Sequence, residues 1–210
     1  MSLPKKLTLS PIKNISGTVD LPGSKSISNR ILLLSMLAEG QTEIRNLLDS
    51  DDTRRMVEAL NTLGVKVLED YNQNRISIYG TSGKIPVSEA TLMLGNAGTA
   101  IRPLTAALTI GKGRFVLDGV QRMRQRPIID LVNGLNQLGA EVSCINGTDS
   151  PPVEVISDGL PGGTTRLSGA ISSQYLSAIL MAAPYAKREV QIEIIDKLVS
   201  VPYVKMTLQL

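Results

Sequence analysis

The sequence predicts an α/β fold in which one unit recurs about three times along 210 residues. Three segments open with small polar residues and continue as an aliphatic run of helical length, beginning at Ser24, Asn96 and Ser172. Arg30 and Arg102 hold the same place in the first two segments, and a strand-like run follows each of the three. Regular recurrence of this kind indicates a repeated structural unit.

The first helix of each unit is expected to be buried. Its body is almost wholly apolar, as in ILLLSML after Arg30 and LTAAL after Pro103. A helix that is apolar on all sides must be surrounded by protein. Three such helices lying side by side, with amphipathic helices and sheets outside them, predict a pseudo-threefold α/β domain whose buried helices are parallel.

A strand and an amphipathic helix follow each buried helix. The strands are expected in TEIRNL near residue 42, RFVLDG near 114 and EVQIEII near 189. The amphipathic stripes of the first two copies are Met56, Val57, Leu60 and Leu63, and Leu131, Val132, Leu135 and Leu138. Both helices end in Leu-Gly, where Gly64 and Gly139 are suited to stop them. Two further β-like runs come next, so each unit is predicted to be βαβαββ.

The third copy stops within its amphipathic helix. This helix is expected to begin at Pro202 and to place Tyr203, Met206 and Leu210 on its apolar stripe. By the register of the second copy, about one more helical turn and a glycine should follow. We therefore expect an incomplete third unit and a chain that is a fragment of a longer protein. A natural C-terminal helix that ends here is the alternative.

Composition excludes several kinds of site. The chain has 22 Lys and Arg against 19 Asp and Glu, and only 3% aromatic residues, so no nucleic-acid surface is expected. Histidine is absent, which removes imidazole catalysis and ordinary zinc sites. Any acid or base must be a carboxylate, a lysine or a tyrosine.

The expected compartment follows from what the sequence lacks. It has no uninterrupted apolar stretch of 18 residues, so no membrane span is expected. The N-terminus has neither a secretory apolar core nor a transit-peptide composition. The single cysteine, Cys144, is compatible with a reducing environment and reads as a small buried hydrophobe. These features predict a cytoplasmic protein.

Cations lie at the predicted helix starts. A helix start leaves backbone N–H groups unpaired and carries roughly half a positive charge, so it attracts anions. Lys25 and Arg30 flank the first start, and Arg126 precedes the second helix of the second copy. If the buried helices are parallel, these cations and starts share one face, which is predicted to bind phosphate or carboxylate groups.

Simpler roles compete at neighbouring residues. Ser24, Thr99 or Ser172, taken singly, are better explained as helix caps. Arg122 and Arg124 are explained equally well as a solvated basic loop.

Two motifs near these residues have simple structural explanations. The acidic stretch LDSDDTRR is expected to be the cap and first turn of a helix, with Ser50 or Asp51 as the cap and no chemistry assigned. GNAGTA, at 95–100, fits neither common nucleotide-binding glycine pattern, and Gly98 more simply lets the backbone approach a ligand.

Five motifs carry a resemblance over essentially the whole chain. LPGSKSISNR, GNAGTAIRPL, RMRQRPI, GAISSQYLSA and LVSVPY resemble, in order and spacing, the 5-enolpyruvylshikimate-3-phosphate (EPSP) synthase family, also called 3-phosphoshikimate 1-carboxyvinyltransferases. The resemblance implies a two-domain transferase of the inside-out α/β barrel type, with three βαβαββ units per domain and the active site between domains. It implies transfer of the enolpyruvyl group of phosphoenolpyruvate to the 5-hydroxyl of shikimate 3-phosphate, in aromatic amino-acid (chorismate) biosynthesis, without metal or organic cofactor.

The resemblance also implies roles for ten residues. Lys25, Arg126 and Gln174 are the implied catalytic residues. Those implied to bind shikimate 3-phosphate are Lys25, Ser26, Arg30, Ser172, Ser173, Gln174, Ser200 and Tyr203. Those implied to bind phosphoenolpyruvate are Lys25, Gly98, Arg126 and Gln174. Pro103 lies in an RPL segment that resembles the form of the family sensitive to the inhibitor glyphosate.

The resemblance covers one domain of two. It implies that residues 1–20 are a strand segment that packs with a C-terminal domain, and that residues 21–210 are the N-terminal substrate-binding domain. The C-terminal domain, which supplies a catalytic Asp and Glu, has no counterpart in this sequence. We therefore expect weak binding of shikimate 3-phosphate and no catalysis by the chain alone.

Two alternatives remain at this point. UDP-N-acetylglucosamine enolpyruvyl transferases are similar in fold and donor chemistry, but their active-site loop carries a reactive cysteine that residues 111–126 lack. The SSQ segment also favours the shikimate substrate. The other alternative is a non-catalytic anion-binding half-domain that awaits a partner half.

Overall fold

The first repeat of the computed structural model contains two helices and three strands. The structure describes residues 6–70, 75–170 and 172–210. The elements of the first repeat are α1 (Lys25–Leu37), β1 (Gln41–Arg45), α2 (Asp51–Thr62), β2 (Val67–Asp70) and β3 (Arg75–Tyr79).

The second repeat contains every predicted element and the third contains four. The second consists of β4 (Glu89–Met93), α3 (Gly98–Leu108), β5 (Lys112–Asp118), the short 3-10 helix η2 (Met123–Gln125), α4 (Ile129–Gln137), β6 (Glu141–Cys144) and β7 (Val153–Asp158). The third consists of β8 (Gly163–Leu167), α5 (Ser173–Ala182), the 3-10 helix η3 (Ala183–Tyr185), β9 (Val190–Ile194) and α6 (Val201–Gln209). The mixed α/β fold and its repeat are thus confirmed.

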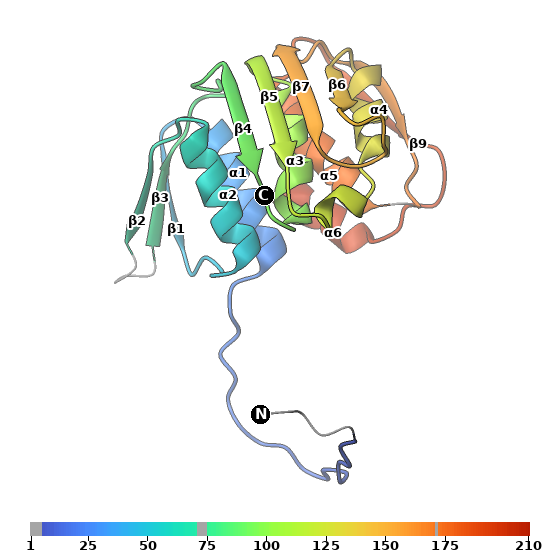
Figure 1. Cartoon of the computed structure of the whole chain (residues 1–210). Coiled ribbons are helices and arrows are strands. Elements are labelled where there is room, and N and C mark those ends of the chain that lie inside the picture. Colours follow the sequence, from blue (N-terminus) through green and yellow to red (C-terminus); the bar gives the residue numbers. More distant parts are fainter. Residues whose placement is uncertain (1–5, 71–74, 171) are drawn as a thin grey trace.

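Three separate sheets flank the helices (Figure 1). Their strand orders are β1-β3-β2, β4-β5-β7-β6 and β8-β9. In the second and third repeats the first two strands pair in parallel, with Glu89 opposite Arg114 and Gly163 opposite Val190. A parallel pair needs a crossover connection, and α3 and α5 provide it. The remaining pairs, in the first and second sheets, are antiparallel.

The centre of the domain is made by α1, α3 and α5. Thr99 is the single residue of the eleven in α3 that is not buried. Helix α3 packs against both α1 and α5, so the three lie side by side. Leu33 on α1, Leu104 on α3 and Ile179 on α5 are fully buried. The prediction of buried first helices is confirmed.

The amphipathic helices were predicted well in two repeats and poorly in the third. Helices α2 and α4 bury their expected stripes and stop before Gly64 and Gly139, whose φ angles are +80° and +84°. The predicted stripe of α6 is wrong, because Val204 and Thr207 are its buried residues whereas Tyr203 is 46% exposed. Helix α6 packs on α5 and turns its Thr207 hydroxyl toward α1, which sets a different face inward.

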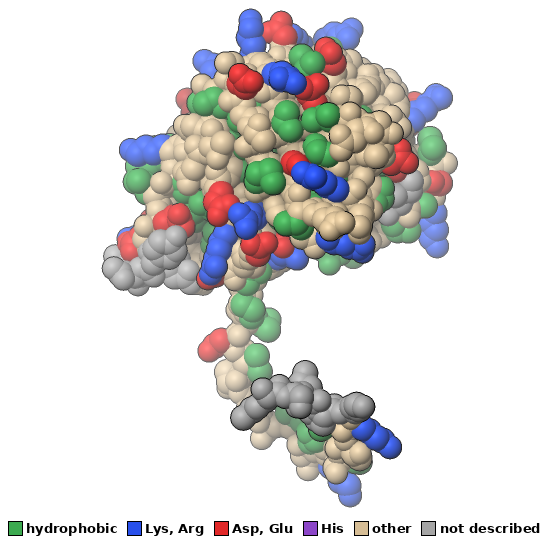
Figure 2. Space-filling model, viewed as in Figure 1, with side chains coloured by type: hydrophobic (Ala, Val, Ile, Leu, Met, Phe, Trp, Pro, Cys, Tyr) green, Lys and Arg blue, Asp and Glu red, His purple; other side chains and the backbone are tan. Residues whose placement is uncertain are grey.

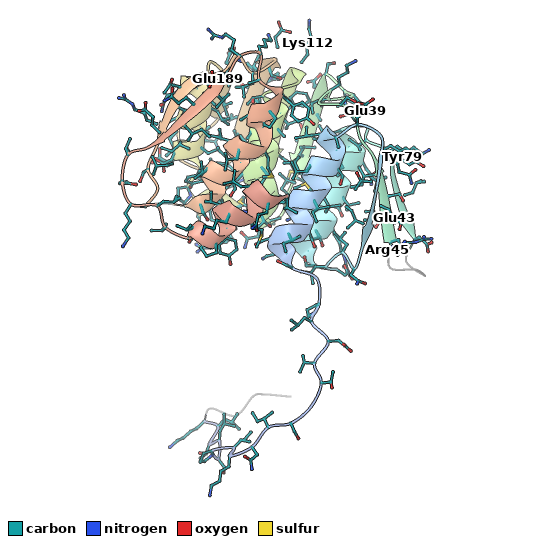
Figure 3. The ribbon with its side chains drawn as sticks, turned by 180° about the vertical axis from the view of Figure 1, so that it is seen from behind. Glu39, Glu43, Arg45, Tyr79, Lys112 and Glu189 are labelled. Carbon is teal, nitrogen blue, oxygen red and sulfur yellow. The ribbon has the colours of Figure 1, made fainter. Side chains whose placement is uncertain are left out.

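The first repeat has no leading strand in the described part of the chain. Residues 6–20 form neither helix nor strand, and all are exposed. They extend away from the domain before α1 begins (Figures 1 and 3). A strand needs a neighbour for its N–H and C=O groups, and this segment pairs with none of the three sheets. Residues 1–5 of the predicted segment lie outside the described residues.

The surface carries mixed charge. Figure 2 shows basic and acidic side chains interspersed over the visible face. Among the described residues, no helix is long and apolar enough to cross a membrane. Within the same residues, no group of three or more His, Cys, Asp or Glu side chains is placed to hold a metal ion.

Candidate anion-binding site

The starts of α1, α3 and α5 meet at one pocket of about 660 Å³. The starts of α2 and α6 reach the same pocket. All ten residues singled out from the sequence line it: Lys25, Ser26, Arg30, Gly98, Arg126, Ser172, Ser173, Gln174, Ser200 and Tyr203. Because each helix start carries roughly half a positive charge, their convergence makes the pocket attractive to anions.

Two of the three expected caps are present. The backbone N–H of Ile27 donates to Ser24 Oγ at 3.5 Å, and that of Gln174 donates to Ser172 Oγ at 3.2 Å. The expected cap at Thr99 is wrong, because α3 has no side-chain cap. Thr99 lies inside the first turn of α3, where its hydroxyl donates instead to Asp52 Oδ2 at 2.7 Å.

Arg102 is a buried cation behind the pocket that the sequence reasoning did not select. It is 6% exposed, and its Nη1 donates to Gln174 Oε1 at 2.7 Å. Burial lowers its pKa, although Tyr175, whose ring lies 5.6 Å from the guanidinium, acts in the opposite direction. The sequence did contain a signal for Arg102, because this residue holds the same place in the second repeat as Arg30 holds in the first.

The contact with Arg102 also orients Gln174. A guanidinium has donors only, so the amide oxygen of Gln174 must face it. The amide N–H₂ group of Gln174 is then directed away from Arg102, and Gln174 lines the pocket. Gln174 can therefore present a hydrogen-bond donor to an anionic ligand.

Arg30 forms hydrogen bonds that connect three helices, α1, α5 and α6. Its Nε donates to Thr207 Oγ1 of α6 at 2.7 Å, and its Nη2 donates to Ser177 Oγ of α5 at 3.1 Å. Its Nη1 donates to the carbonyl of Ser26 at 2.9 Å. Burial lowers the pKa of Arg30, and Tyr203 partly offsets that effect. Arg30 is thus both a lining residue and a brace between α1, α5 and α6.

The loop before α4 places Arg126 beside the start of α3. Its Nη1 donates to the carbonyl of Asn96 at 2.9 Å and to Asn96 Oδ1 at 3.2 Å. A β-carbon built on Gly98 would overlap Nη2 of Arg126 and lie 2.5 Å from Nη1 of Arg102. Glycine at position 98 therefore lets two guanidinium groups approach the same helix start.

The neighbouring residue Pro127 is anchored from behind. Its carbonyl accepts hydrogen bonds from Tyr175 Oη at 2.8 Å and from Arg102 Nη2 at 3.2 Å. Burial raises the pKa of Tyr175, with Arg102 acting against it, so the phenol stays a donor. These two bonds hold the loop that carries Arg126 against α3 and α5.

Arg122 and Arg124 do not line the pocket. Arg124 forms a two-pronged pair with Asp118, with Nη2 to Oδ2 at 2.5 Å and Nε to Oδ1 at 3.0 Å. Arg122 donates to Gln125 Oε1 at 3.2 Å. Arg122 is therefore exposed, as a solvated basic loop requires, whereas Arg124 is held by the carboxylate of Asp118.

The three arginines at the pocket have no carboxylate partner among the described residues. Arg30, Arg102 and Arg126 donate to hydroxyl, amide and carbonyl oxygens and form no ion pair there. Lys25 lies 3.6 Å from Asp52. Arg30 and Arg102 are buried, and an uncompensated buried cation is costly, so this arrangement indicates a site whose negative charge comes from a ligand.

Comparison with known proteins identifies the family. The model of the EPSP synthase (3-phosphoshikimate 1-carboxyvinyltransferase) family matches residues 9–210. The chain belongs to the EPSP synthase family. The resemblance read from the five motifs is thereby confirmed.

Named relatives within the EPSP synthase family are close in sequence. The chain is 61% identical to the chloroplastic 3-phosphoshikimate 1-carboxyvinyltransferase of Petunia hybrida, covering 99% of this chain and 42% of that protein. It is 54% identical to the 3-phosphoshikimate 1-carboxyvinyltransferase of Shewanella pealeana, covering 98% of this chain and 48% of that one. The chain therefore spans less than half the length of these relatives.

A solved structure confirms the fold class. The EPSP synthase from Acinetobacter baumannii, at 28% sequence identity, superposes with a TM-score of 0.76 over 86% of this chain and 41% of that one. The described structure therefore corresponds to part of an EPSP synthase, as the predicted half of an inside-out barrel requires.

Proposed function

We propose that this chain is the substrate-binding half of an enzyme that transfers the enolpyruvyl group of phosphoenolpyruvate to the 5-hydroxyl of shikimate 3-phosphate. The observation that carries the proposal is the pocket at the joined helix starts, which Arg30 and Arg126 line and behind which Arg102 contacts Gln174. Both proposed substrates carry phosphate, and phosphoenolpyruvate carries a carboxylate as well. The family of the chain supports the same assignment.

The chemistry needs positioning and charge neutralisation. Protonation of phosphoenolpyruvate at C3 makes C2 electrophilic, and the 5-hydroxyl oxygen bonds to C2 while losing its proton. The resulting tetrahedral adduct then loses phosphate from C2 and a proton from C3. Lys25 and Arg126 would neutralise the phosphate and carboxylate charge, and Gln174 would donate a hydrogen bond to the bound ligands.

Substrate positions follow from the helices that carry the residues. Ser172 and Ser173 at the start of α5, with Ser26, Arg30, Ser200 and Tyr203, would hold shikimate 3-phosphate. Gly98 and Arg126, at the start of α3, would hold phosphoenolpyruvate, and Lys25 and Gln174 would reach both. Backbone N–H groups at helix starts suit phosphate oxygens, which supports this arrangement.

The chain alone is proposed to bind shikimate 3-phosphate weakly and not to catalyse the reaction. It spans 42% of the length of the petunia relative, and a site built between two domains would be open on one side here. A calorimetric titration with shikimate 3-phosphate tests the binding, and assay of phosphate release tests the incompetence. Release above background by this chain would overturn the second statement. The cytoplasmic location stays a prediction, since the petunia relative is named as chloroplastic.

The test of the proposed roles uses the complete enzyme that contains this sequence. Lys25→Met and Arg126→Ala are each expected to lower turnover by orders of magnitude, because each removes a charge from the pocket. Lys112→Met and Arg122→Ala are the matched controls, since both residues lie outside the pocket and the side chain of Lys112 is 85% exposed. Near-normal kinetics in either pocket variant would contradict the assignment of that residue.

A further inference from the structure

Two carboxylates of α2 line the cationic pocket, those of Asp51 and Asp52, and Asp52 is the one that approaches Lys25. Asp52 is half-buried, with a side-chain exposure of 19%. Its Oδ1 lies 3.6 Å from Nζ of Lys25, and its Oδ2 accepts the hydrogen bond from Thr99 Oγ1 at 2.7 Å. Thr99 in turn accepts from Nδ2 of the buried Asn29 at 2.7 Å. This chain of contacts joins the starts of α1, α2 and α3.

Helix capping does not account for Asp52. Ser50 is the N-cap of α2, and with Thr53 it forms a reciprocal capping box. Asp51 is exposed, pairs with Arg55 at 3.5 Å and already supplies a negative charge to the first turn. The side chain of Asp52 is instead held in the pocket by Thr99, so its carboxylate faces Lys25 and not only solvent.

The lysine that Asp52 faces is otherwise weakly constrained. The side chain of Lys25 is 47% exposed, and a lysine has a flexible four-carbon stem with high rotamer entropy. Pairing through one oxygen restricts that freedom and leaves N–H donors of the ammonium group for a ligand. The fixed end of the pair is Asp52, because Thr99 donates a hydrogen bond to it and Asn29 in turn donates to Thr99.

We propose that Asp52 is a positioning residue that holds the ammonium group of Lys25 at the start of α1 for the anionic substrate. This inference rests on the proposed function of the pocket. Asp52 touches no substrate in this scheme and acts through Lys25. Its own negative charge opposes a bound anion, so the two effects of Asp52 must be separated by experiment.

A double-mutant cycle separates them. The affinity of the chain for shikimate 3-phosphate is measured for the original chain, Asp52→Asn, Lys25→Met and the double variant. Asp52→Asn removes the repulsion between Asp52 and the anion whether or not Lys25 is present, so this effect cancels when the two backgrounds are compared. The positioning effect is lost only in the background that still has Lys25, so it remains as the difference. We expect the effect of Asp52→Asn on the dissociation constant to be about three- to fivefold less favourable with Lys25 than without it. Equal effects in the two backgrounds overturn the proposal.

Amine labelling provides a readout that needs no substrate. Acetylation of Lys25 by an N-hydroxysuccinimide ester, measured by peptide mass spectrometry relative to Lys112, is expected to accelerate at least twofold in Asp52→Asn. Asp49→Asn is the matched control, because Asp49 lies outside the pocket and pairs with Arg54. An unchanged Lys25 rate in Asp52→Asn overturns the proposal.

The two readouts also distinguish this inference from the proposed function. If the original chain does not bind shikimate 3-phosphate at millimolar concentrations, the proposed binding fails, and labelling still decides whether Asp52 restrains Lys25. If binding is present and the cycle shows no coupling, the positioning role fails while the proposed function stands.

Discussion

Replacing Thr207 by valine removes the hydroxyl that ties α6 to the buried Arg30, together with its contacts to Ser177 and to the carbonyl of Tyr203. Threonine and valine have nearly the same shape, so packing changes little. The Thr207 hydroxyl accepts from Arg30 Nε at 2.7 Å and lies 3.1 Å from Ser177 Oγ. Both Thr207 and Arg30 are less than 10% exposed, so water does not readily replace the lost acceptor.

The expected cost follows from these contacts. A buried hydrogen bond from a charged group contributes about 1.5–3 kcal/mol, and leaving the donor unpaired costs a similar amount. We expect Thr207→Val to lower the free energy of unfolding by about 1.5–3 kcal/mol. For a chain of this size that corresponds to a fall in the midpoint temperature of about 3–12 °C.

Urea unfolding followed by circular dichroism measures the difference. Thr62→Val is the matched control, because Thr62 is exposed and its hydroxyl donates to the carbonyl of Glu58 on its own helix. The control is expected to change stability by less than about 0.5 kcal/mol. If both valine variants are equally stable, Arg30 does not depend on α6, and the brace between α1, α5 and α6 is refuted.

Two further predictions concern the loop and the core. Burial would raise the pKa of Asp118, but hydrogen bonds from Arg124 and from the N–H of Gly119 outweigh it and hold that pKa below its usual value. The carboxylate therefore adds stability above about pH 4 that is lost as the pH falls through the folded-state pKa. Urea unfolding at pH 6 and pH 3 should show a smaller difference for Asp118→Asn than for the original chain, and parallel losses would contradict the prediction. In the core, Leu104→Ala should cost about 2–5 kcal/mol in the same assay, because the side chain is fully buried. Leu208→Ala, at a site 66% exposed, is its control and should change stability by less than about 0.5 kcal/mol; an equal loss in both would refute the core assignment.

The parts of the fold that depend on local pattern were predictable. An all-apolar helix body identified α3 as central, and it is buried at every residue but Thr99. The Leu-Gly endings fixed the ends of α2 and α4, because Gly64 and Gly139 adopt left-handed backbone conformations. The convergence of the helix starts followed from three parallel buried helices, and it brought all ten candidate residues into one pocket.

The parts that depend on distant partners were not predictable. Asp52 read as a first-turn acid because nothing local shows that Thr99, 47 residues away, turns it toward Lys25. From the sequence, Arg102 was recognised only as the residue that corresponds to Arg30 in the repeat. Its role was not predictable, because its contact with Gln174 joins residues 72 positions apart. The stripe of α6 failed for the same reason, because Arg30, near the other end of the chain, determines that Thr207 faces inward.

The central claim is that several helix starts bind one anion together. A titration of the ¹⁵N-labelled chain with shikimate 3-phosphate, followed by amide chemical shifts, tests it most directly. We expect the amides of Ser26, Thr99 and Gln174, on three different helices, to shift with one common dissociation constant. Shifts confined to a single helix start, or saturation at different ligand concentrations, would contradict it.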